Sequence, residues 1–344
     1  MTVLSNREIG SEFWSIPVLS QKENNLFPKE TSWFLSGRVA LEYIISDIKA
    51  KFCVSSVAMP SWCCDSMIIP FVKNGIEVMF YTFQDSDSIP ECDILFCMEH
   101  FGYIRNGKEI NFPGIVIHDV THSLFSENLG MKKINGAKAQ YFFGSLRKWA
   151  GFKTGGFAGC LGGEFTAQTP IVTSNEYIKL RTQAMLDKEK YISGKTDSKE
   201  YLKLFSKAEE MLDCGTYGFA TEDDVSAAKK LDVELIRKCR RENAAQLLEV
   251  VSDIAIYPEI RENDCPLFVP IRLKKEMRDE LRKHLIEHNV FCPLHWPLTK
   301  YHTITDKQRQ IYDEELSLVC DQRYTTDDMD YICELISDFR RTKV

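Results

Sequence analysis

The chain has 344 residues, which is long for a single domain and enough for two. Its formal net charge is −7, whereas phosphate backbones demand clustered Lys and Arg, so nucleic acid is excluded as a partner. Hydrophobic residues make up 44% and charged residues 27% of the sequence, which are ordinary values for a globular protein. No apolar run approaches the roughly 20 residues that span a bilayer, so we expect no membrane association.

The sequence contains 12 cysteines, but their spacing favours neither disulfides nor metal ligation. They are scattered along the chain, and no pair has the spacing of a zinc finger. The N-terminal residues lack the basic and apolar pattern of a secretory signal. We therefore expect reduced thiols, no metal site and a cytoplasmic location.

In chain order, residues 1–34 are irregular and rich in aromatic side chains, which predicts an N-terminal arm that packs on the rest of the protein. A helix is predicted to begin after Ser36, a suitable N-cap residue. Short apolar runs then predict buried strands at 52–59, 76–81, 92–98 and 114–118. Strands that alternate with helices predict an α/β fold with a mainly parallel sheet covered by helices.

The second half of the chain has a different pattern. Residues 173–212 are charged and helical with a weak break at 193–195, and residues 222–251 predict one long helix. Further elements are predicted as strands at 266–273, 290–293 and 316–320 and as helices at 277–288 and 326–339. We therefore predict a large domain over residues 35–215 and a smaller α+β domain over residues 216–344.

Lys148 carries the most specific signal in the sequence. It follows Ser145 by three residues and precedes a glycine-rich run, and upstream Asp119 ends an apolar strand. A pyridoxal phosphate (PLP) site needs a lysine that forms an imine with the aldehyde and an acid that keeps the pyridine nitrogen protonated. Taken alone, Lys148 also fits a solvated surface lysine, and Asp119 fits a turn or helix N-cap.

Other residues fit the same site but are individually ambiguous. Ser36, Gly37 and Arg38 form a turn at a helix N-terminus, where free backbone N–H groups attract a phosphate. His122 follows Asp119 by three residues, within reach of a cofactor held there, although a core histidine is the commoner outcome. Trp62 is a candidate wall for the cofactor ring and equally a candidate core residue.

The order of these segments resembles the fold-type I PLP-dependent enzymes and, more narrowly, the DegT/StrS sugar aminotransferase family. The resemblance is carried by residues 36–41, 59–62, 75–81, 100–102, 119–122, 145–148 and 155–156. It implies a homodimer in which Lys148 carries PLP, Asp119 pairs with the pyridine nitrogen and His122 lies by the ring hydroxyl. It also implies that the phosphate is held by Ser36, Gly37, Arg38 and Ser145.

One departure from the family concerns a Gly-x-Asn-x-Arg stretch before its long helix. Residues 215–223 occupy the corresponding place and contain neither the Asn nor the Arg. This departure leaves open both the phosphate contact from the partner subunit and the sugar-nucleotide substrate.

We predict a PLP-dependent aminotransferase that acts on a small-molecule amine and keto pair of amino-acid or sugar type. Arg323 is the candidate for gripping a substrate carboxylate, because a guanidinium forks onto two oxygens. Its alternative is an ion pair with Asp321 or Asp327. His295 is predicted to reach the substrate from the smaller domain, with plain packing as its alternative.

Three other functions stay open. The first keeps PLP but catalyses dehydration, racemisation or a lyase reaction. The second is a catalytically silent PLP-fold protein that binds a ligand without turnover. The third is a nucleotide-binding oxidoreductase, which the absence of G-x-G-x-x-G after the first strand disfavours.

Overall fold

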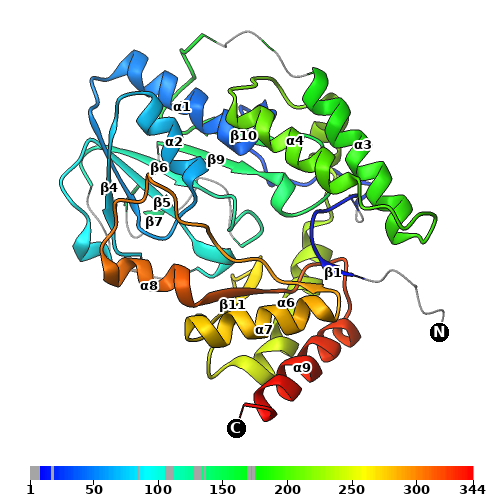
Figure 1. The fold of residues 1–344 in the computed structure, drawn as a ribbon. Coiled ribbons are helices and arrows are strands. Elements are labelled where there is room, and N and C mark those ends of the chain that lie inside the picture. The colour runs from blue at the N-terminus through cyan, green and yellow to red at the C-terminus, as the bar shows by residue number, and fades with distance from the viewer. Residues whose placement is uncertain are drawn as a thin grey trace.

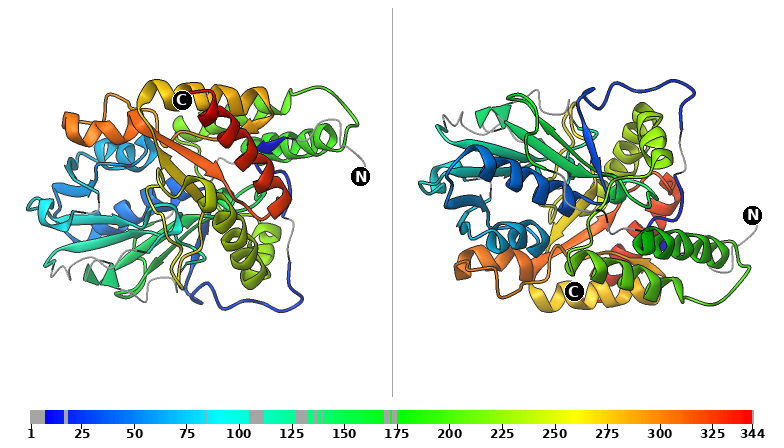
Figure 2. Two further views of the ribbon diagram at one scale, coloured as in Figure 1. Left: turned by 90° about the horizontal axis from the view of Figure 1, so that it is seen from below. Right: turned by 90° about the horizontal axis from the view of Figure 1, so that it is seen from above.

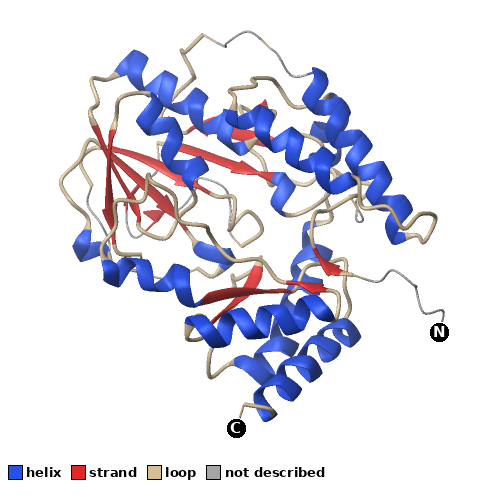
Figure 3. Ribbon diagram, viewed as in Figure 1, coloured by secondary structure: helices blue, strands red, loops and turns tan. Residues whose placement is uncertain are grey.

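The computed structural model describes residues 8–16, 19–83, 85–104, 112–126, 133–134, 137–138, 140–168, 172 and 175–343. Its centre is a seven-stranded sheet in the order β2-β10-β9-β6-β5-β3-β4 (Figures 1 and 3). The strands of this sheet are β2 (Ser32–Phe34), β3 (Ser56–Pro60), β4 (Glu77–Tyr81), β5 (Ile94–Met98), β6 (Ile115–Asp119), β9 (Tyr141–Ser145) and β10 (Gly156–Cys160). Strands β9, β6, β5, β3 and β4 are parallel, and β10 runs antiparallel to both β9 and β2.

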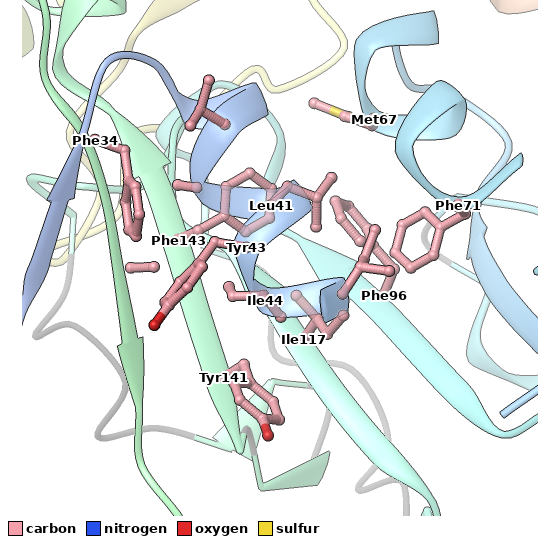
Figure 4. Packing of buried hydrophobic residues seen from close by; sticks show 14 of the residues in the cluster. Phe34, Leu41, Tyr43, Ile44, Met67, Phe71, Phe96, Ile117, Tyr141 and Phe143 are labelled. Atoms are coloured by element: carbon pink, nitrogen blue, oxygen red, sulfur yellow. The ribbon is translucent and has the colours of Figure 1, made fainter. Parts of the chain in front are cut away.

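Helix α1 (Gly37–Lys51) begins where the sequence predicts, because the Ser36 hydroxyl accepts a hydrogen bond from the Val39 N–H at 3.3 Å. Its apolar face packs on the sheet, and Figure 4 shows Leu41 and Ile44 of the helix in one cluster with Phe143 and other strand residues. Burial of each such side chain contributes about 1.5–3 kcal/mol. This packing holds the N-terminus of α1 against the sheet.

The remaining helices either pack near the central sheet or, as α6, α7 and α9 do, belong to the C-terminal half of the chain (Figure 1). They are α2 (Asp65–Lys73), α3 (Asn175–Ile192), α4 (Tyr201–Asp213), α5 (Glu222–Lys229), α6 (Val233–Val251), α7 (Lys275–Glu287), α8 (Asp306–Glu314) and α9 (Thr326–Arg341). Helices α3 and α4 form an antiparallel hairpin that lies beside the N-terminal arm in both views of Figure 2. None of the described helices is long and apolar enough to cross a membrane.

Three two-stranded sheets complete the described structure. The pairs are β1 (Ile9–Gly10) with β12 (Val290–Phe291), β11 (Phe268–Arg272) with β13 (Glu315–Val319), and β7 (Lys133–Ile134) with β8 (Ala137–Lys138). The β11–β13 pair packs against α6, α7 and α9 around a second apolar core. The β1–β12 pair ties the N-terminal arm to the C-terminal half of the chain.

The α/β architecture with a mainly parallel central sheet is confirmed, and so is the break in 173–212, which is the turn between α3 and α4. The single long helix over 222–251 is wrong. The chain forms α5 and α6 instead, because Asp232 caps a new helix by accepting from the Leu235 N–H at 3.0 Å. The arm is also less irregular than expected, since it contributes β1 and β2. Its residues 1–7 and 17–18 lie outside the described part of the chain.

Candidate active site

The polar residues singled out in the sequence meet at the carboxyl ends of two neighbouring strands. Strand β6 ends at Asp119, and β9 ends at Ser145 in the adjacent position of the sheet. A 3-10 turn over Leu146–Lys148 follows β9 directly and brings Lys148 to the same edge. This is where ligands collect in parallel sheets.

Two adjoining cavities lie at this edge. The small cavity has a volume of about 190 Å³, and the large cavity has a volume of about 420 Å³. Both are lined by His122, Arg147, Lys148 and Trp296. The small cavity is also lined by five further residues that matter here, namely Gly37, Arg38, Asp119, Thr121 and Ser145. Asp119 and Lys148, which are far apart in sequence, therefore face one space.

One end of the small cavity suits an anion. The N-terminus of α1 lies there, and a Cβ added at Gly37 would stand only 3.2 Å from the Ser145 Cβ, so glycine permits the close approach of helix and strand. The Ser145 Oγ is buried without a hydrogen-bond partner, and so is the Nε of Arg38, whose Nη1 pairs with Asp213. Orphaned donors beside the positive end of a helix dipole form a binding site for an anion such as a phosphate.

Asp119 is an isolated acid in a buried setting. Its side chain is 1% exposed, and its Oδ1 accepts a hydrogen bond from the Thr121 N–H at 2.8 Å. Burial raises the pKa of Asp119 to about 6. A buried carboxylate is costly unless a cation or a donor pairs with it, so this position is prepared for a positively charged partner.

His122 is neutral at physiological pH. Its Nδ1 accepts a hydrogen bond from the Phe101 N–H at 3.2 Å, which leaves the proton on Nε2. Burial, with smaller contributions from His295, His100 and Lys148, holds the pKa of His122 well below its usual range. Trp296 stacks on the His122 ring, with 5.6 Å between the ring centroids. The imidazole can thus donate a hydrogen bond toward the small cavity but carries no charge.

Lys148 lines both cavities and is exposed, with no hydrogen bond or ion pair to another described residue. Its neighbour Arg147, which sequence reasoning missed, is held by the carboxylate of Glu209 and by the Tyr177 hydroxyl at 3.0 Å. Burial opposes ionisation of Glu209, but the Arg147 guanidinium outweighs it and lowers the pKa of Glu209 to about 2. The α3–α4 hairpin therefore places an ionised carboxylate at the small cavity, which Lys148 also lines.

Trp62 does not take the place predicted for it. It is fully buried and lines neither cavity. Its ring stacks on His100 at 5.0 Å between centroids, and its indole N–H donates to the His295 carbonyl, so the side chain turns into the core behind the site. Trp296 supplies the aromatic wall of the small cavity instead.

Arg323 lines the large cavity, but its guanidinium already has a carboxylate partner. Its Nε and Nη2 donate to the two oxygens of Asp321 at 2.9 and 2.8 Å, and its other hydrogen bonds are to the carbonyls of Ser11 and Glu12. The guanidinium also lies 3.9 Å from the centroid of the Phe13 ring. This geometry does not support a grip on a substrate carboxylate, because the fork that would hold it is occupied. Arg323 instead anchors the N-terminal arm.

His295 does reach the large cavity from the C-terminal half of the chain. Its Nδ1 lies 2.8 Å from the Ser317 Oγ, and its ring centroid lies 6.3 Å from that of His122. The two histidines thus approach one another from different parts of the sequence at the junction of the cavities.

No protein-family profile and no curated protein sequence matches the chain. Solved structures do. An aminotransferase of Brucella abortus described as DegT, DnrJ, EryC1 and StrS is 14% identical and has a TM-score of 0.58, with 90% of this chain and 85% of that chain covered. The aminotransferase TlmJ of Streptoalloteichus hindustanus is 10% identical with a TM-score of 0.60, covering 91% and 86%.

A third structure, NtdA of Bacillus subtilis with the cofactor PMP bound, is 13% identical with a TM-score of 0.58 and covers 90% of this chain and 73% of that chain. At such identities the likeness concerns the fold. This chain has the fold of the fold-type I PLP-dependent sugar aminotransferases.

Proposed function

We propose that the protein is a PLP-dependent aminotransferase acting on a small-molecule amine and keto pair of amino-acid or sugar type. The observation that carries the proposal is the small cavity, which combines Asp119, Lys148 and an anion-binding helix N-terminus in one space. These are the three groups that a PLP site requires. The structural likeness to aminotransferases, one of them with PMP bound, supports the same cofactor.

The residues present fit this cofactor at each of its ends. The phosphate would be held by Gly37, Arg38 and Ser145, with the α1 N-terminus that Ser36 caps, and the orphaned Ser145 Oγ would gain its missing partner. Asp119 would pair with the protonated pyridine nitrogen, and this positive charge would offset the cost of burying the Asp119 carboxylate. The neutral His122 would donate to the ring hydroxyl.

When bound, PLP would supply an electron sink for the reacting carbon of the substrate. Lys148 would hold the cofactor covalently, and its free amine would carry a proton to and from the substrate carbon, first as base and then as acid. Asp119 keeps the pyridine nitrogen protonated throughout. Trp296 and His122 line both cavities and would flank the cofactor on this side.

The test is a half-reaction. Purified protein loaded with PLP is incubated with a panel of amino donors, and the conversion of PLP to pyridoxamine phosphate is followed by absorbance and chromatography. An aminotransferase converts the cofactor stoichiometrically and regenerates PLP with a keto acid. Turnover of a donor without pyridoxamine phosphate would instead indicate elimination, racemisation or lyase chemistry, and no reaction with any donor would indicate a silent binding protein.

Ser145→Ala provides a first prediction. We expect the affinity for PLP to fall about 10- to 100-fold, since a hydrogen bond to a charged group is lost. The stability of the apoprotein should not fall, because the Ser145 Oγ has no partner there. The measurements are PLP titration by fluorescence and thermal unfolding without cofactor.

Ser126→Ala is the matched control with the opposite pattern. The Ser126 hydroxyl donates to the Gly102 carbonyl at 2.8 Å, away from both cavities. This variant should lose stability and keep its affinity for PLP. Equal PLP affinity in Ser145→Ala and the original protein would remove Ser145 from the phosphate site.

We further propose that the protein works as a homodimer and that it is cytoplasmic. We also propose that its large domain ends near residue 215 and that the smaller domain follows. Lys148 is more exposed than a lysine that must shed its proton, so cover from a second subunit is in keeping with the chemistry. All twelve cysteines are free thiols, which agrees with a reducing compartment. Light scattering of the purified protein should give the mass of two chains, and a monomer that turns over substrate would contradict the dimer.

A further inference from the structure

The large cavity is rich in positive charge. Its lining includes five cationic side chains and only two carboxylates, namely Arg147, Lys148, Arg240, Arg282 and Arg323 against Glu12 and Asp321. Two of the guanidinium groups already have a carboxylate partner, and a third, that of Arg282, is partly exposed to solvent. Arg323 pairs with Asp321, Arg147 pairs with Glu209, and the Arg282 Nε donates to the Cys292 carbonyl at 3.2 Å. Arg240 remains to be explained.

Arg240 is completely buried on helix α6 and has only neutral partners. Its Nε donates to the Gln322 amide oxygen at 2.7 Å, and its Nη1 donates to the carbonyls of Pro266 and Leu267 at 3.2 and 3.0 Å. Its Nη2 is buried without any hydrogen-bond partner. The guanidinium lies 4.5 Å from the centroid of the Trp149 ring, directly after Lys148 in the chain.

Arg240 differs in this respect from the other buried cations. Among the described residues, the fully buried arginines and lysines Arg181, Lys188 and Arg278 each have a carboxylate within 4.0 Å. No carboxylate lies within that distance of Arg240 in the described part of the chain. Asp321 acts on Arg240 only from beyond that distance and is already paired with Arg323. A buried charge that no carboxylate contacts directly is costly, so its position at a cavity wall favours an anionic ligand there.

We propose that Arg240 binds an anionic group of the substrate, either a carboxylate or a phosphate ester, at the wall of the large cavity. The proposal deepens the proposed function and rests on it for the identity of the ligand as a substrate. The buried guanidinium is held by three hydrogen bonds and by the Trp149 ring, so it is positioned before the ligand arrives. The open Nη2 donor and a charge that no carboxylate contacts directly select an anion over a neutral group of the same shape.

The experiment measures binding of matched probes to the PLP-loaded protein by isothermal titration calorimetry. Succinate is compared with succinamide, and glycerol 3-phosphate with glycerol, so that each anion has a neutral counterpart. We expect at least one anion to bind and its neutral counterpart to bind at least about 10-fold more weakly. Preference for succinate identifies a carboxylate as the natural group, and preference for glycerol 3-phosphate identifies a phosphate ester.

Arg240→Gln should weaken binding of the preferred anion by at least about 30-fold and leave the neutral probe unchanged. The control is Arg241→Gln, since Arg241 is the next residue on α6, donates to the carbonyls of Arg261, Glu262 and Asp264, and lines neither cavity. It should bind the anion as the original protein does. If Arg240→Gln does not fold, Arg240→Lys is used in its place. Lysine keeps the positive charge but lacks the planar guanidinium, so the affinity for the anion should fall roughly 10-fold.

Unchanged anion binding in Arg240→Gln or Arg240→Lys would overturn the proposal, as would failure of the original protein to bind either anion. Failure of the proposed function is recognised separately, by the absence of a PLP adduct on Lys148 after borohydride reduction. A protein that carries the adduct but binds anions without Arg240 would keep its proposed function and lose only this inference.

Discussion

We expect Lys148→Ala to abolish transamination and the covalent link to PLP, with turnover falling at least about 10³-fold. The side chain is the only amine among the residues that line the small cavity in the described structure, so no neighbour can replace it as cofactor anchor or as proton carrier. The variant should still fold, because Lys148 is exposed and makes no hydrogen bond or ion pair with another described residue. The measurements are the absorbance of the PLP-loaded protein and the half-reaction with amino donors.

Lys153→Ala is the matched control. Lys153 belongs to the same segment but lines neither cavity, so its loss should leave both the absorbance and the half-reaction intact. Undiminished conversion of PLP in Lys148→Ala would show that another amine carries the chemistry.

Asp119→Asn is expected to raise the stability of the apoprotein above pH 4 and to lower the activity of the PLP-loaded protein. Burial raises the pKa of Asp119 to about 6 from an ordinary value of 3.8. Between these values the folded state holds the proton and the unfolded state does not, so the contribution of this group to stability is full below pH 3.8 and is lost as the pH rises through 6. Above pH 6 the ionised carboxylate costs the apoprotein roughly 3 kcal/mol.

The asparagine variant does not titrate, and its amide oxygen can still accept from the Thr121 N–H. Its advantage over the original apoprotein should therefore grow from pH 4 to pH 6 and stay constant above. Urea unfolding of both apoproteins between pH 4 and pH 8 measures this difference. A stability difference that is independent of pH would contradict the assignment of Asp119 as a buried, unpaired acid.

With PLP bound, the same variant should lose activity by about 100-fold or more, because the charged partner of the pyridine nitrogen is gone. Asp321→Asn is the contrasting control. Burial raises the pKa of Asp321, but the Arg323 guanidinium outweighs it and holds that pKa below its usual value. Loss of this charge should destabilise the protein at neutral pH, which is the opposite sign to Asp119→Asn.

The small cavity was predictable from the sequence because its residues are fixed by local rules. A helix N-cap places Ser36 and Gly37, and the ends of parallel strands place Asp119 and Ser145 at one edge of the sheet. Lys148 then follows from the short turn after β9. Each of these positions depends on chain direction and spacing, which sequence patterns report well.

The wrong or incomplete predictions concern side chains whose orientation is set by distant parts of the chain. Trp62 turns into the core because His100 and the His295 carbonyl receive it there, and neither contact has a sequence signal. The ion pair of Arg323 with Asp321 was the stated alternative to a substrate grip, and sequence spacing alone could not choose between the two. Glu209 reaches Arg147 across 62 residues from a helix that reads as a solvated, charged surface element.

Arg147 and helix α8 could have been found. An arginine directly before Lys148 shares its turn and so its neighbourhood, which is a usable signal. Helix α8 begins with a capping box at Thr305 and Gln308, a pattern readable in the sequence. The break between α5 and α6 is likewise marked by Asp232.

The central claim is that Lys148 and Asp119 hold one PLP molecule between them. The most direct measurement is borohydride reduction of the PLP-loaded protein, followed by proteolysis and mass mapping of the phosphopyridoxyl group. We predict a single adduct on Lys148, which the Lys148→Ala variant lacks. An adduct confined to another lysine, or none in folded protein at saturating PLP, would contradict the account.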